Sequence, residues 1–385
     1  MPYERANIQN LSAYTPGEQP QSGERIIKLN TNENPYPPIA PVMEAIRSLP
    51  GEALRKYPSP AAMTFRKTAA QVHGVDPDQI LATNGGDELL RLAISVFCDP
   101  SAATSGVGGI GVVEPSYSLY PVLAAAHDTP VTRVPLNADY SLPDDLEKRM
   151  LDAGVAMVML VNPHAPSGAL IPLTRLDKLA SALQGQAVLL IDEAYVDFAT
   201  HDCLPLVRKT SGLDNVLLLR TMSKGYSLAG LRFGYGIGSA NLIAAMDKAR
   251  DSYNTDALSQ VAATAAVANR ALAAESWKKV IAERSRMTNE LTKRGWHVFP
   301  SQTNFILAVP PTKPDGESAS RRSKDATAPL SVDIKAPVAK SIYESLKARN
   351  ILVRYFDHEG LRDKLRITIG TPEENDAVLG ALDSK

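Results

Sequence analysis

The chain has 385 residues and a mass of 41.4 kDa, more than one hydrophobic core usually holds, so we expect two domains and a cleft. Its 44% hydrophobic and 22% charged residues and its formal net charge of -1 argue against nucleic acid as a partner. The two cysteines, Cys98 and Cys203, form no metal-binding or disulfide pattern, and no stretch is apolar enough for a membrane span. We therefore expect a cytoplasmic protein without a structural metal and without membrane contact.

Residues 1–40 are predicted to form an extended N-terminal arm, because they are rich in Pro, Asn and Gly and show little periodicity. From about residue 79 onward, apolar strands alternate with helical patterns. This alternation predicts an α/β fold in which a mostly parallel sheet, wrapped by helices, forms a large domain over residues 41–255. The predicted strands are QILAT, GIGVVE, VAMVMLV, AVLLIDE and NVLLLRT, and the predicted helices span 87–97, 117–126 and 173–183.

Residues 256–385 are predicted to form a smaller α+β domain together with its connecting helices. The Ala-rich stretch 257–294 indicates long helices, and another helix is predicted over 336–349 with Pro337 in its first turn. The segment 311–335 is polar, charged and rich in Ser and Pro, which is typical of a flexible surface loop. The predicted strands of this domain lie in WHVFP, TNFILAV, ILVRYF and KLRITIG.

Lys224 stands among small residues and hydroxyls in TMSKGYSLAGLRFGYGIG, directly after the apolar strand NVLLLR. In such surroundings a lysine can bind phosphate through its charge, or it can act as an imine-forming amine whose proton affinity is lowered. The lysine alone does not distinguish these two roles.

Asp192 ends the very apolar strand AVLLID, where a buried carboxylate is costly unless it meets a cation or strong donors. A protonated ring nitrogen of a cofactor is one such cation, while a buried ion pair or a helix cap is the structural alternative. Tyr195 follows three residues later and could reach another atom of the same ring.

The stretch ATNGGDELL places Gly86 and Asp87 where a strand passes into a helix, a position at which free backbone amides and the helix dipole favour a phosphate. Tyr117 in PSYSLYP follows the next strand and could stack on a planar ring, although core packing is the ordinary role of such an aromatic.

These motifs occur in the order seen in the pyridoxal-phosphate-dependent aminotransferases of fold type I, which the chain resembles over nearly its whole length. The order is phosphate loop, stacking aromatic, NP…PSG, DEAY, SK and an arginine eight residues later. Within that group the sequence is similar to the histidinol-phosphate aminotransferases, a class II subgroup. The segments that resemble this subgroup are NIQNLSAYTPGEQ, IIKLNTNENPYPP, RKYPSP, SKGYSLAGLRFGY, ILVRYFD and LRITIGT.

The resemblance implies a homodimer that binds pyridoxal 5'-phosphate and transfers an amino group between L-histidinol phosphate and 2-oxoglutarate, in histidine biosynthesis. Lys224 would bind the cofactor covalently and move a proton in the reaction. Asp192 would hold the pyridinium nitrogen, Tyr195 the phenolic oxygen, and Tyr117 would cover the ring. The phosphate of the cofactor would be held by Gly86, Asp87, Thr221, Ser223 and Arg232, and by Tyr57 of the other subunit.

The resemblance also implies a substrate site. Arg366 would receive the carboxylate of glutamate and, in the other half-reaction, help to bind the substrate phosphate, because a planar guanidinium suits both anions. Arg354 and the arm residue Tyr14 would bind the phosphate with it, although an exposed arginine after a strand is an equally ordinary role for Arg354. Asn34 is expected to order the arm.

One position departs from the family pattern. In the family's NPNNPTG loop, the asparagine directly before PTG donates a hydrogen bond to the phenolic oxygen of the cofactor. Here the loop reads Asn162-Pro163-His164-Ala165-Pro166-Ser167-Gly168, and Ala165 has no donor. Tyr195 therefore acts alone, or His164 or a water substitutes.

Other functions are compatible with the same motifs. Threonine-phosphate decarboxylases and aromatic amino-acid aminotransferases of this fold share most cofactor residues, and the bond that breaks at Cα depends on an orientation that sequence does not reveal. A regulator that binds pyridoxal phosphate or a metabolite without catalysis is a further alternative. The presence of Lys224, Asp192 and both candidate anion-binding arginines argues against it.

Overall fold

The computed structural model of the protein describes residues 3–14, 17–20, 26–100, 108–311 and 336–384. The predicted loop at 311–335 lies outside these ranges except for its first residue, Pro311. None of the described helices has the length and the apolar composition that a membrane span requires.

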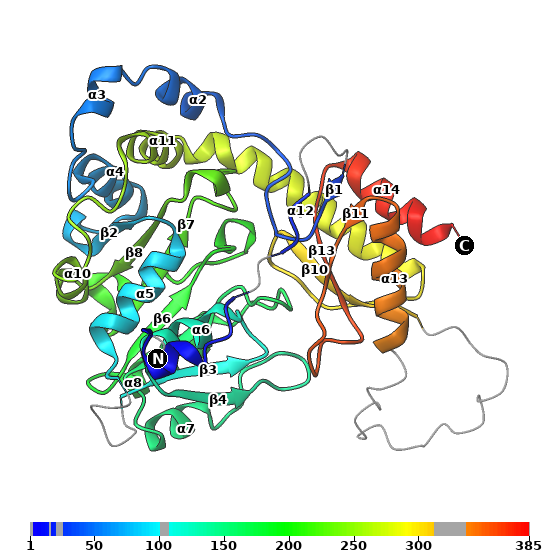
Figure 1. The fold of residues 1–385 in the computed structure, drawn as a ribbon, viewed down its shortest axis with the longest axis horizontal. Coiled ribbons are helices and arrows are strands. Elements are labelled where there is room, and N and C mark those ends of the chain that lie inside the picture. Colours follow the sequence, from blue (N-terminus) through cyan, green and yellow to red (C-terminus); the bar gives the residue numbers. More distant parts are fainter. Residues whose placement is uncertain (1–2, 15–16, 21–25, 101–107, 312–335, 385) are drawn as a thin grey trace.

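A seven-stranded sheet forms the centre of the larger part of the molecule (Figure 1). Its strand order is β2-β8-β7-β6-β5-β3-β4, and the five strands from β7 to β4 run parallel. Only β8 is antiparallel to its neighbours β2 and β7. The prediction of a mostly parallel sheet is therefore confirmed. The strands are β2 (Ile80–Thr83), β3 (Ile110–Glu114), β4 (Val131–Pro135), β5 (Met157–Val161), β6 (Val188–Asp192), β7 (Val216–Thr221) and β8 (Gly234–Gly238).

Helices cover both faces of this sheet, which explains why its central strands are apolar at nearly every position. In β6, Leu189 and Ile191 join one hydrophobic cluster while Leu190 joins another, because successive side chains of a strand point to opposite faces. The helices of this part are α2 (Ala40–Arg47), α3 (Gly51–Arg55), α4 (Met63–His73), α5 (Gly86–Phe97), α6 (Leu119–Ala126), α7 (Leu146–Asp152), α8 (Leu173–Leu183), α9 (Leu204–Val207), α10 (Ala240–Asp247) and α11 (Ala257–Ala268).

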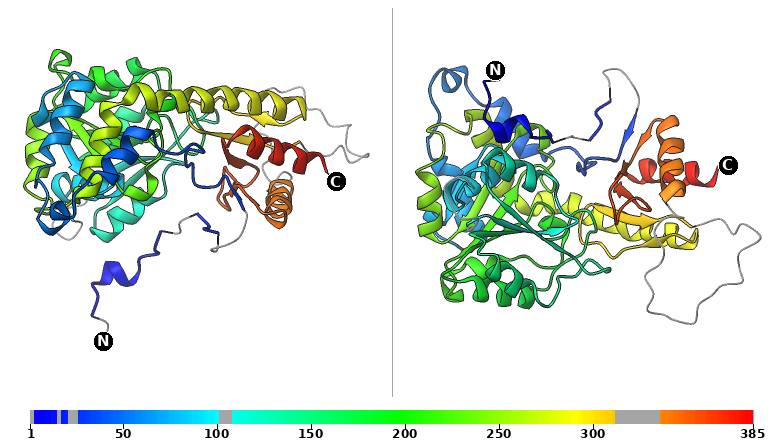
Figure 2. Two further views of the ribbon diagram at one scale, coloured as in Figure 1. Left: turned by 90° about the horizontal axis from the view of Figure 1, so that it is seen from above. Right: turned by 60° about the horizontal axis from the view of Figure 1, so that its bottom comes forward.

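The C-terminal part contains a four-stranded antiparallel sheet of order β12-β13-β10-β9, which confirms the predicted small α+β unit. The long helix α12 (Arg270–Lys293) reaches from the large sheet to this smaller one (Figure 2). The boundaries predicted at 40/41 and 255/256 stay predictions. The remaining elements are β9 (His297–Val298), β10 (Phe305–Val309), β11 (Ile351–Leu352), β12 (Arg354–Tyr355), β13 (Leu365–Thr368), α13 (Ala336–Ala348) and α14 (Pro372–Asp383).

The N-terminal arm contacts both parts of the molecule. Its short helix α1 (Ala6–Gln9) lies against α6, where the Asn7 side chain donates to the carbonyl of Ala125 at 2.8 Å. Further along, β1 (Ile27–Lys28) pairs in parallel with β11. The arm thus runs past the region between the two sheets.

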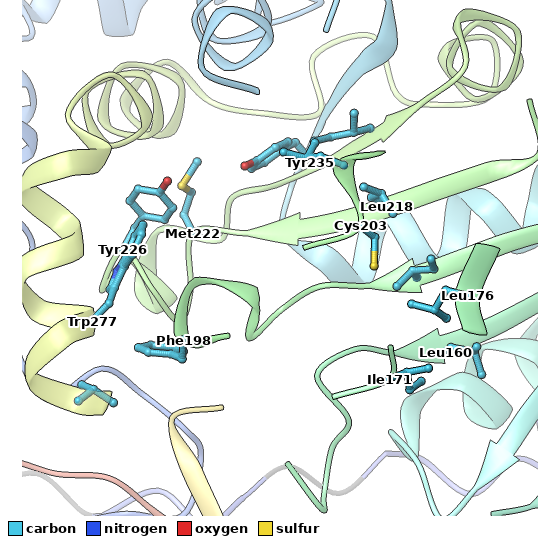
Figure 3. Close-up of a cluster of buried hydrophobic side chains, with 14 of the residues drawn as sticks. Leu160, Ile171, Leu176, Phe198, Cys203, Leu218, Met222, Tyr226, Tyr235 and Trp277 are labelled. Atoms are coloured by element: carbon cyan, nitrogen blue, oxygen red, sulfur yellow. The ribbon is translucent and has the colours of Figure 1, made fainter. Parts of the chain in front are cut away.

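Helix α12 also fixes the loop that follows β7. Trp277 of this helix packs edge-on against Tyr226, with ring centroids 5.4 Å apart, as Figure 3 shows. The indole nitrogen of Trp277 donates to the carbonyl of Gly225 at 2.6 Å. These contacts hold the backbone on the C-terminal side of Lys224.

Candidate active site

A cavity of about 780 Å³ opens at the carboxyl ends of the parallel strands, beside the small sheet. This is the position at which open α/β sheets bind their ligands. Twelve of the thirteen residues predicted for the site line this cavity, namely Tyr14, Gly86, Asp87, Tyr117, Asp192, Tyr195, Thr221, Ser223, Lys224, Arg232, Arg354 and Arg366.

Lys224 places its amine in this cavity from the loop between β7 and β8. Its Nζ donates a hydrogen bond to the backbone carbonyl of Thr31, in the arm, at 2.8 Å. Burial and then the nearby charge of Arg366 lower the pKa of Lys224 to about 8. A useful fraction of this amine is therefore neutral near pH 7, which is the form that attacks a carbonyl.

Asp192 lies at the end of β6 and is 5% exposed. Tyr120 donates to its Oδ2 and the backbone amide of Ala194 to its Oδ1, both at 3.0 Å. Burial raises the pKa of this carboxyl to about 6, and no described lysine or arginine forms an ion pair with it. A buried carboxylate with donors but no cation fits the positively charged nitrogen of a bound ring.

The next residue, Glu193, differs from Asp192 because it has a cationic partner. Glu193 is also buried, but it points to the other side of the sheet, where Arg220 pairs with it at 2.8 Å. Arg220 also pairs with Asp202, at 3.0 Å. Of the two adjacent carboxylates, the protein supplies a cation only to the one that faces away from the cavity.

The turn before α5 fits a phosphate. Gly85 has a φ of +79°, a backbone conformation that residues with a side chain rarely adopt, so this turn favours glycine. Gly86 then begins α5, whose free amides and dipole favour an anion. Thr221 and Ser223 place linked hydroxyls in the same cavity, 2.9 Å apart.

Tyr195 also lines the cavity and is 9% exposed. Its hydroxyl accepts a hydrogen bond from Asn32 at 3.0 Å. Ala165 lines the cavity here without a donor. His164 points elsewhere, because its Nδ1 meets Ser167 Oγ at 2.7 Å and its Nε2 meets the carbonyl of Pro115 at 2.9 Å. These contacts do not agree with the alternative in which His164 takes the place of the missing donor.

Three tyrosines line the wall between the arm and α6. The rings of Tyr14 and Tyr117 meet edge-on with centroids 6.0 Å apart, and Tyr117 meets Tyr120 in the same way at 5.5 Å. The cluster brings the arm residue Tyr14 to the predicted ring-stacking residue.

The small sheet adds two guanidinium groups. Arg354 and Arg366 are direct partners in the β12-β13 register, and both lie over the Phe356 ring, at 5.3 and 5.4 Å from its centroid. Neither forms an ion pair with a described carboxylate. Arg366 donates to the carbonyl of Asn30 at 2.9 Å, while its buried Nε has no hydrogen-bond partner in the described part of the chain. Burial lowers the pKa of Arg366, because a buried cation without an anion is unfavourable. A bound anion would offset this cost.

Tyr57 does not line the cavity. It is 80% exposed and stacks on Tyr253, with ring centroids 4.4 Å apart. Its predicted role in the other subunit's site stays a prediction.

Sequence reasoning missed Tyr120, Thr31 and Asn32. Tyr120 had a signal, because it stands three residues after Tyr117, a spacing that shares one side of a helix. Asn34 orders the arm as expected, since its amide donates to the carbonyl of Gly225 at 3.1 Å.

Comparison with known proteins agrees with this geometry. A sequence model of the family described as aminotransferase class I and II matches residues 24–382. Histidinol-phosphate aminotransferase 1 of Trichormus variabilis is 39% identical over 380 residues, covering 99% of this chain and 98% of that protein. The histidinol-phosphate aminotransferase of Geobacter sp. is 40% identical over 382 residues, covering 98% and 97%.

Among solved structures, the histidinol-phosphate aminotransferase of Sinorhizobium meliloti, in complex with pyridoxal 5'-phosphate, superposes with a TM-score of 0.83. The two sequences are 26% identical, and the match covers 99% of this chain and 97% of that one. The chain therefore belongs to the class I and II aminotransferases, among the histidinol-phosphate aminotransferases.

Proposed function

We propose that the protein is a pyridoxal-phosphate-dependent transaminase that exchanges an amino group between L-histidinol phosphate and 2-oxoglutarate in histidine biosynthesis. The observation that supports this most is the pair formed by Lys224 and Asp192, an amine of lowered pKa and a cation-free buried carboxylate in one cavity. The full-length similarity to histidinol-phosphate aminotransferases supports the choice of substrate.

The cavity fits each polar end of the cofactor. Asp192 would hold the pyridinium nitrogen, Tyr195 would donate to the phenolic oxygen, and Tyr117 would cover the ring. Gly86, Asp87, Thr221, Ser223 and Arg232 would hold the phosphate. When bound, pyridoxal phosphate supplies an electron-withdrawing ring that accepts the electron pair left at the substrate Cα.

Lys224 would have two tasks. Its neutral amine would attach the cofactor, and after the substrate amine has displaced it, the same amine would take the proton from Cα and return it to the cofactor carbon. A pKa of about 8 suits both, because the group can hold or release a proton near neutral pH.

Arg354 and Arg366 would select the substrates. Both substrates have an anionic group, a phosphate in one and a carboxylate in the other. Both guanidinium groups line the cavity, and Arg366 Nε is buried there without a hydrogen-bond partner among the described residues. Tyr14 would complete this end of the site from the arm. Two adjacent cations also favour a dianionic phosphate over a neutral side chain.

We further propose that the protein is a cytoplasmic homodimer with composite sites. Tyr57 and Tyr253 form an exposed aromatic pair, and Leu54 and Met63, which flank Tyr57 in the sequence, are exposed as well. An apolar surface of this kind suits contact with a second copy, in which Tyr57 would reach the partner's cofactor phosphate.

The substrate is tested by half-reactions. Cofactor-loaded protein is mixed with histidinol phosphate, phosphothreonine or phenylalanine, and the cofactor absorbance is followed. We expect rapid conversion to the amino form of the cofactor with histidinol phosphate alone. Carbon dioxide release from phosphothreonine would indicate a decarboxylase. Protein that shows no cofactor absorbance after incubation with pyridoxal phosphate would indicate a metabolite-binding protein.

Lys224 and the dimer are tested together. The Lys224→Ala chain should fold, lose covalent attachment and lose nearly all turnover, whereas activity near the parent's level would exclude this lysine. Mixing Lys224→Ala with Tyr57→Phe chains should change activity only after subunits exchange. A fully active monomer would contradict the composite site.

A further inference from the structure

The arm residue Asn32 is hydrogen-bonded to Tyr195, a residue 163 positions away in the sequence. Asn32 Nδ2 donates to the Tyr195 hydroxyl oxygen at 3.0 Å, and Asn32 is only 2% exposed. Asn32 has a φ of +56°, a conformation that asparagine adopts more readily than most residues. This position therefore suits asparagine both in backbone conformation and in side-chain chemistry.

The contacts around Asn32 agree with an amide whose nitrogen faces Tyr195. The backbone amide of Asn32 donates to Thr368 Oγ1 at 3.1 Å, and the Thr368 hydroxyl donates to Asn32 Oδ1 at 3.0 Å. Because the Thr368 hydroxyl gives its single hydrogen to Oδ1, this contact agrees with an amide whose other end, Nδ2, faces Tyr195. Asn304 holds the same segment by donating to the Asn32 carbonyl at 2.9 Å.

This orientation decides what Tyr195 does with its own proton. A phenol has one hydrogen to donate, and in the contact with Asn32 its oxygen is the acceptor. The hydrogen of Tyr195 therefore stays free for a ligand in the cavity. Phe305 packs edge-on against the Tyr195 ring, with centroids 5.1 Å apart, and limits its movement.

Neither Ala165 nor His164 supplies a donor to the phenolic oxygen of the cofactor. Ala165 has none. His164 is buried, and burial lowers its pKa to about 4, so the ring is neutral with one N–H. That N–H lies on Nε2, since the carbonyl of Pro115 can only accept, and Nδ1 accepts from Ser167.

We propose that Asn32 is a positioning residue that directs the Tyr195 hydroxyl hydrogen onto the phenolic oxygen of the cofactor, and so compensates for the donor that Ala165 lacks. The inference rests on the proposed function, because it requires pyridoxal phosphate in this cavity. It assigns to the arm a part in the electronics of the cofactor, in addition to lining the cavity with Tyr14 and Thr31.

The test uses variants that separate this role from a structural one. Asn32→Gly removes the amide and tolerates a positive φ. Asn32→Asp keeps the shape but turns the donor into an acceptor, so that Tyr195 would donate to the new carboxylate instead of the cofactor. Tyr195→Phe removes the hydroxyl, and Asn304→Ala loosens the same arm segment without touching the amide of Asn32.

Two readouts are independent of turnover. The first is the dissociation constant of pyridoxal phosphate in a Lys224→Ala background, where binding is reversible. The second is the pH midpoint of the visible absorbance change in the cofactor-loaded protein with Lys224 intact. A donor to the phenolic oxygen stabilises its negative charge, which weakens its hold on the neighbouring proton and lowers that midpoint.

We expect Asn32→Gly to weaken cofactor binding about tenfold and to raise the midpoint by about one pH unit, as the loss of one hydrogen bond to a charged oxygen predicts. Tyr195→Phe should do at least as much. In the Tyr195→Phe chain, Asn32→Gly should add less than about twofold, because residues that act through one hydroxyl are not additive. Asn32→Asp should be no better than Asn32→Gly, and Asn304→Ala should leave the midpoint unchanged.

Additive effects of Asn32→Gly and Tyr195→Phe would overturn the proposal, as would a parent-like midpoint in Asn32→Asp. If Asn32→Gly does not fold, the isosteric Asn32→Asp decides by the same midpoint. Failure of the parent to bind pyridoxal phosphate would instead refute the proposed function.

Discussion

The Tyr120 hydroxyl donates to Oδ2 of Asp192 at 3.0 Å, from a helix on one side of the cavity to a strand end at its floor. This hydrogen bond stabilises the charged form of a carboxylate that burial otherwise disfavours. Tyr120 thus influences the protonation of Asp192, which lies 72 positions later in the sequence.

Tyr120→Phe should weaken pyridoxal phosphate binding by about tenfold, because the pKa of Asp192 rises further and less carboxylate is available for the ring nitrogen. The measurement is a cofactor titration at pH 7. Tyr235→Phe is the matched control, since it loses a buried hydroxyl contact with His73 at 2.9 Å, away from the cavity. Equal losses of affinity in both variants would contradict the role of Tyr120.

Asp192→Asn should stabilise the cofactor-free protein by about 2 kcal/mol at pH 7.5. The pKa of Asp192 is raised to about 6 in the folded state, so the parent loses stability as pH rises from about 4 to 6. The gain should shrink at pH 4.5, and it should reverse when pyridoxal phosphate is added. Denaturation at both pH values, with and without cofactor, measures this.

The neighbouring carboxylate provides the control. Glu193→Gln should destabilise the protein at pH 7.5 by about 3 kcal/mol, because it leaves the buried Arg220 without its full partner. A loss of stability in both variants would mean that Asp192 is paired in the cofactor-free protein.

Arg366→Ala should lower kcat/KM about 100-fold for both glutamate and histidinol phosphate, through the loss of a bidentate contact with each anion. Arg354→Ala should lower it mainly for histidinol phosphate. Arg362→Ala, which removes an exposed pair with Asp357, should change neither value. Equal losses for both substrates in both site variants would contradict this division of labour.

Ala165→Asn should restore the family's donor and shift the pH midpoint of the cofactor absorbance about one unit lower. His164→Ala should leave the midpoint in place, because the two ring nitrogens already contact Ser167 and the carbonyl of Pro115. An unmoved midpoint in Ala165→Asn together with a raised one in His164→Ala would show that His164 is the donor after all.

The sequence predicts the elements with strong local patterns. Helix α8 has the predicted bounds, Leu173–Leu183, and β6 ends at Asp192 as expected. The pattern of alternating strands and helices begins only near residue 79, so it does not predict α2, α3 and α4. The strands β4 and β8 are also not predicted. The GYGIG of β8 has little hydrophobic periodicity, and its antiparallel direction depends on the path of the chain.

The predicted site residues come mainly from motifs at strand ends, and parallel strands bring such ends to one edge. Tyr120 could be recognised from its spacing to Tyr117. Thr31 and Asn32 could not, because each reaches the site through a contact between distant segments. Local pattern gives no information on such pairs, which only the folded backbone brings together.

The hydrogen bonds between Asn32 and Thr368 also limit when the arm can fold during synthesis. The two residues are 336 positions apart, so the ribosome needs roughly 20 to 70 seconds between them. The strands that present Lys224 and Asp192 emerge well before that interval ends. The arm segment at Asn32 is translated long before Thr368, but it takes its final position only after the strand that contains Thr368 has left the exit tunnel.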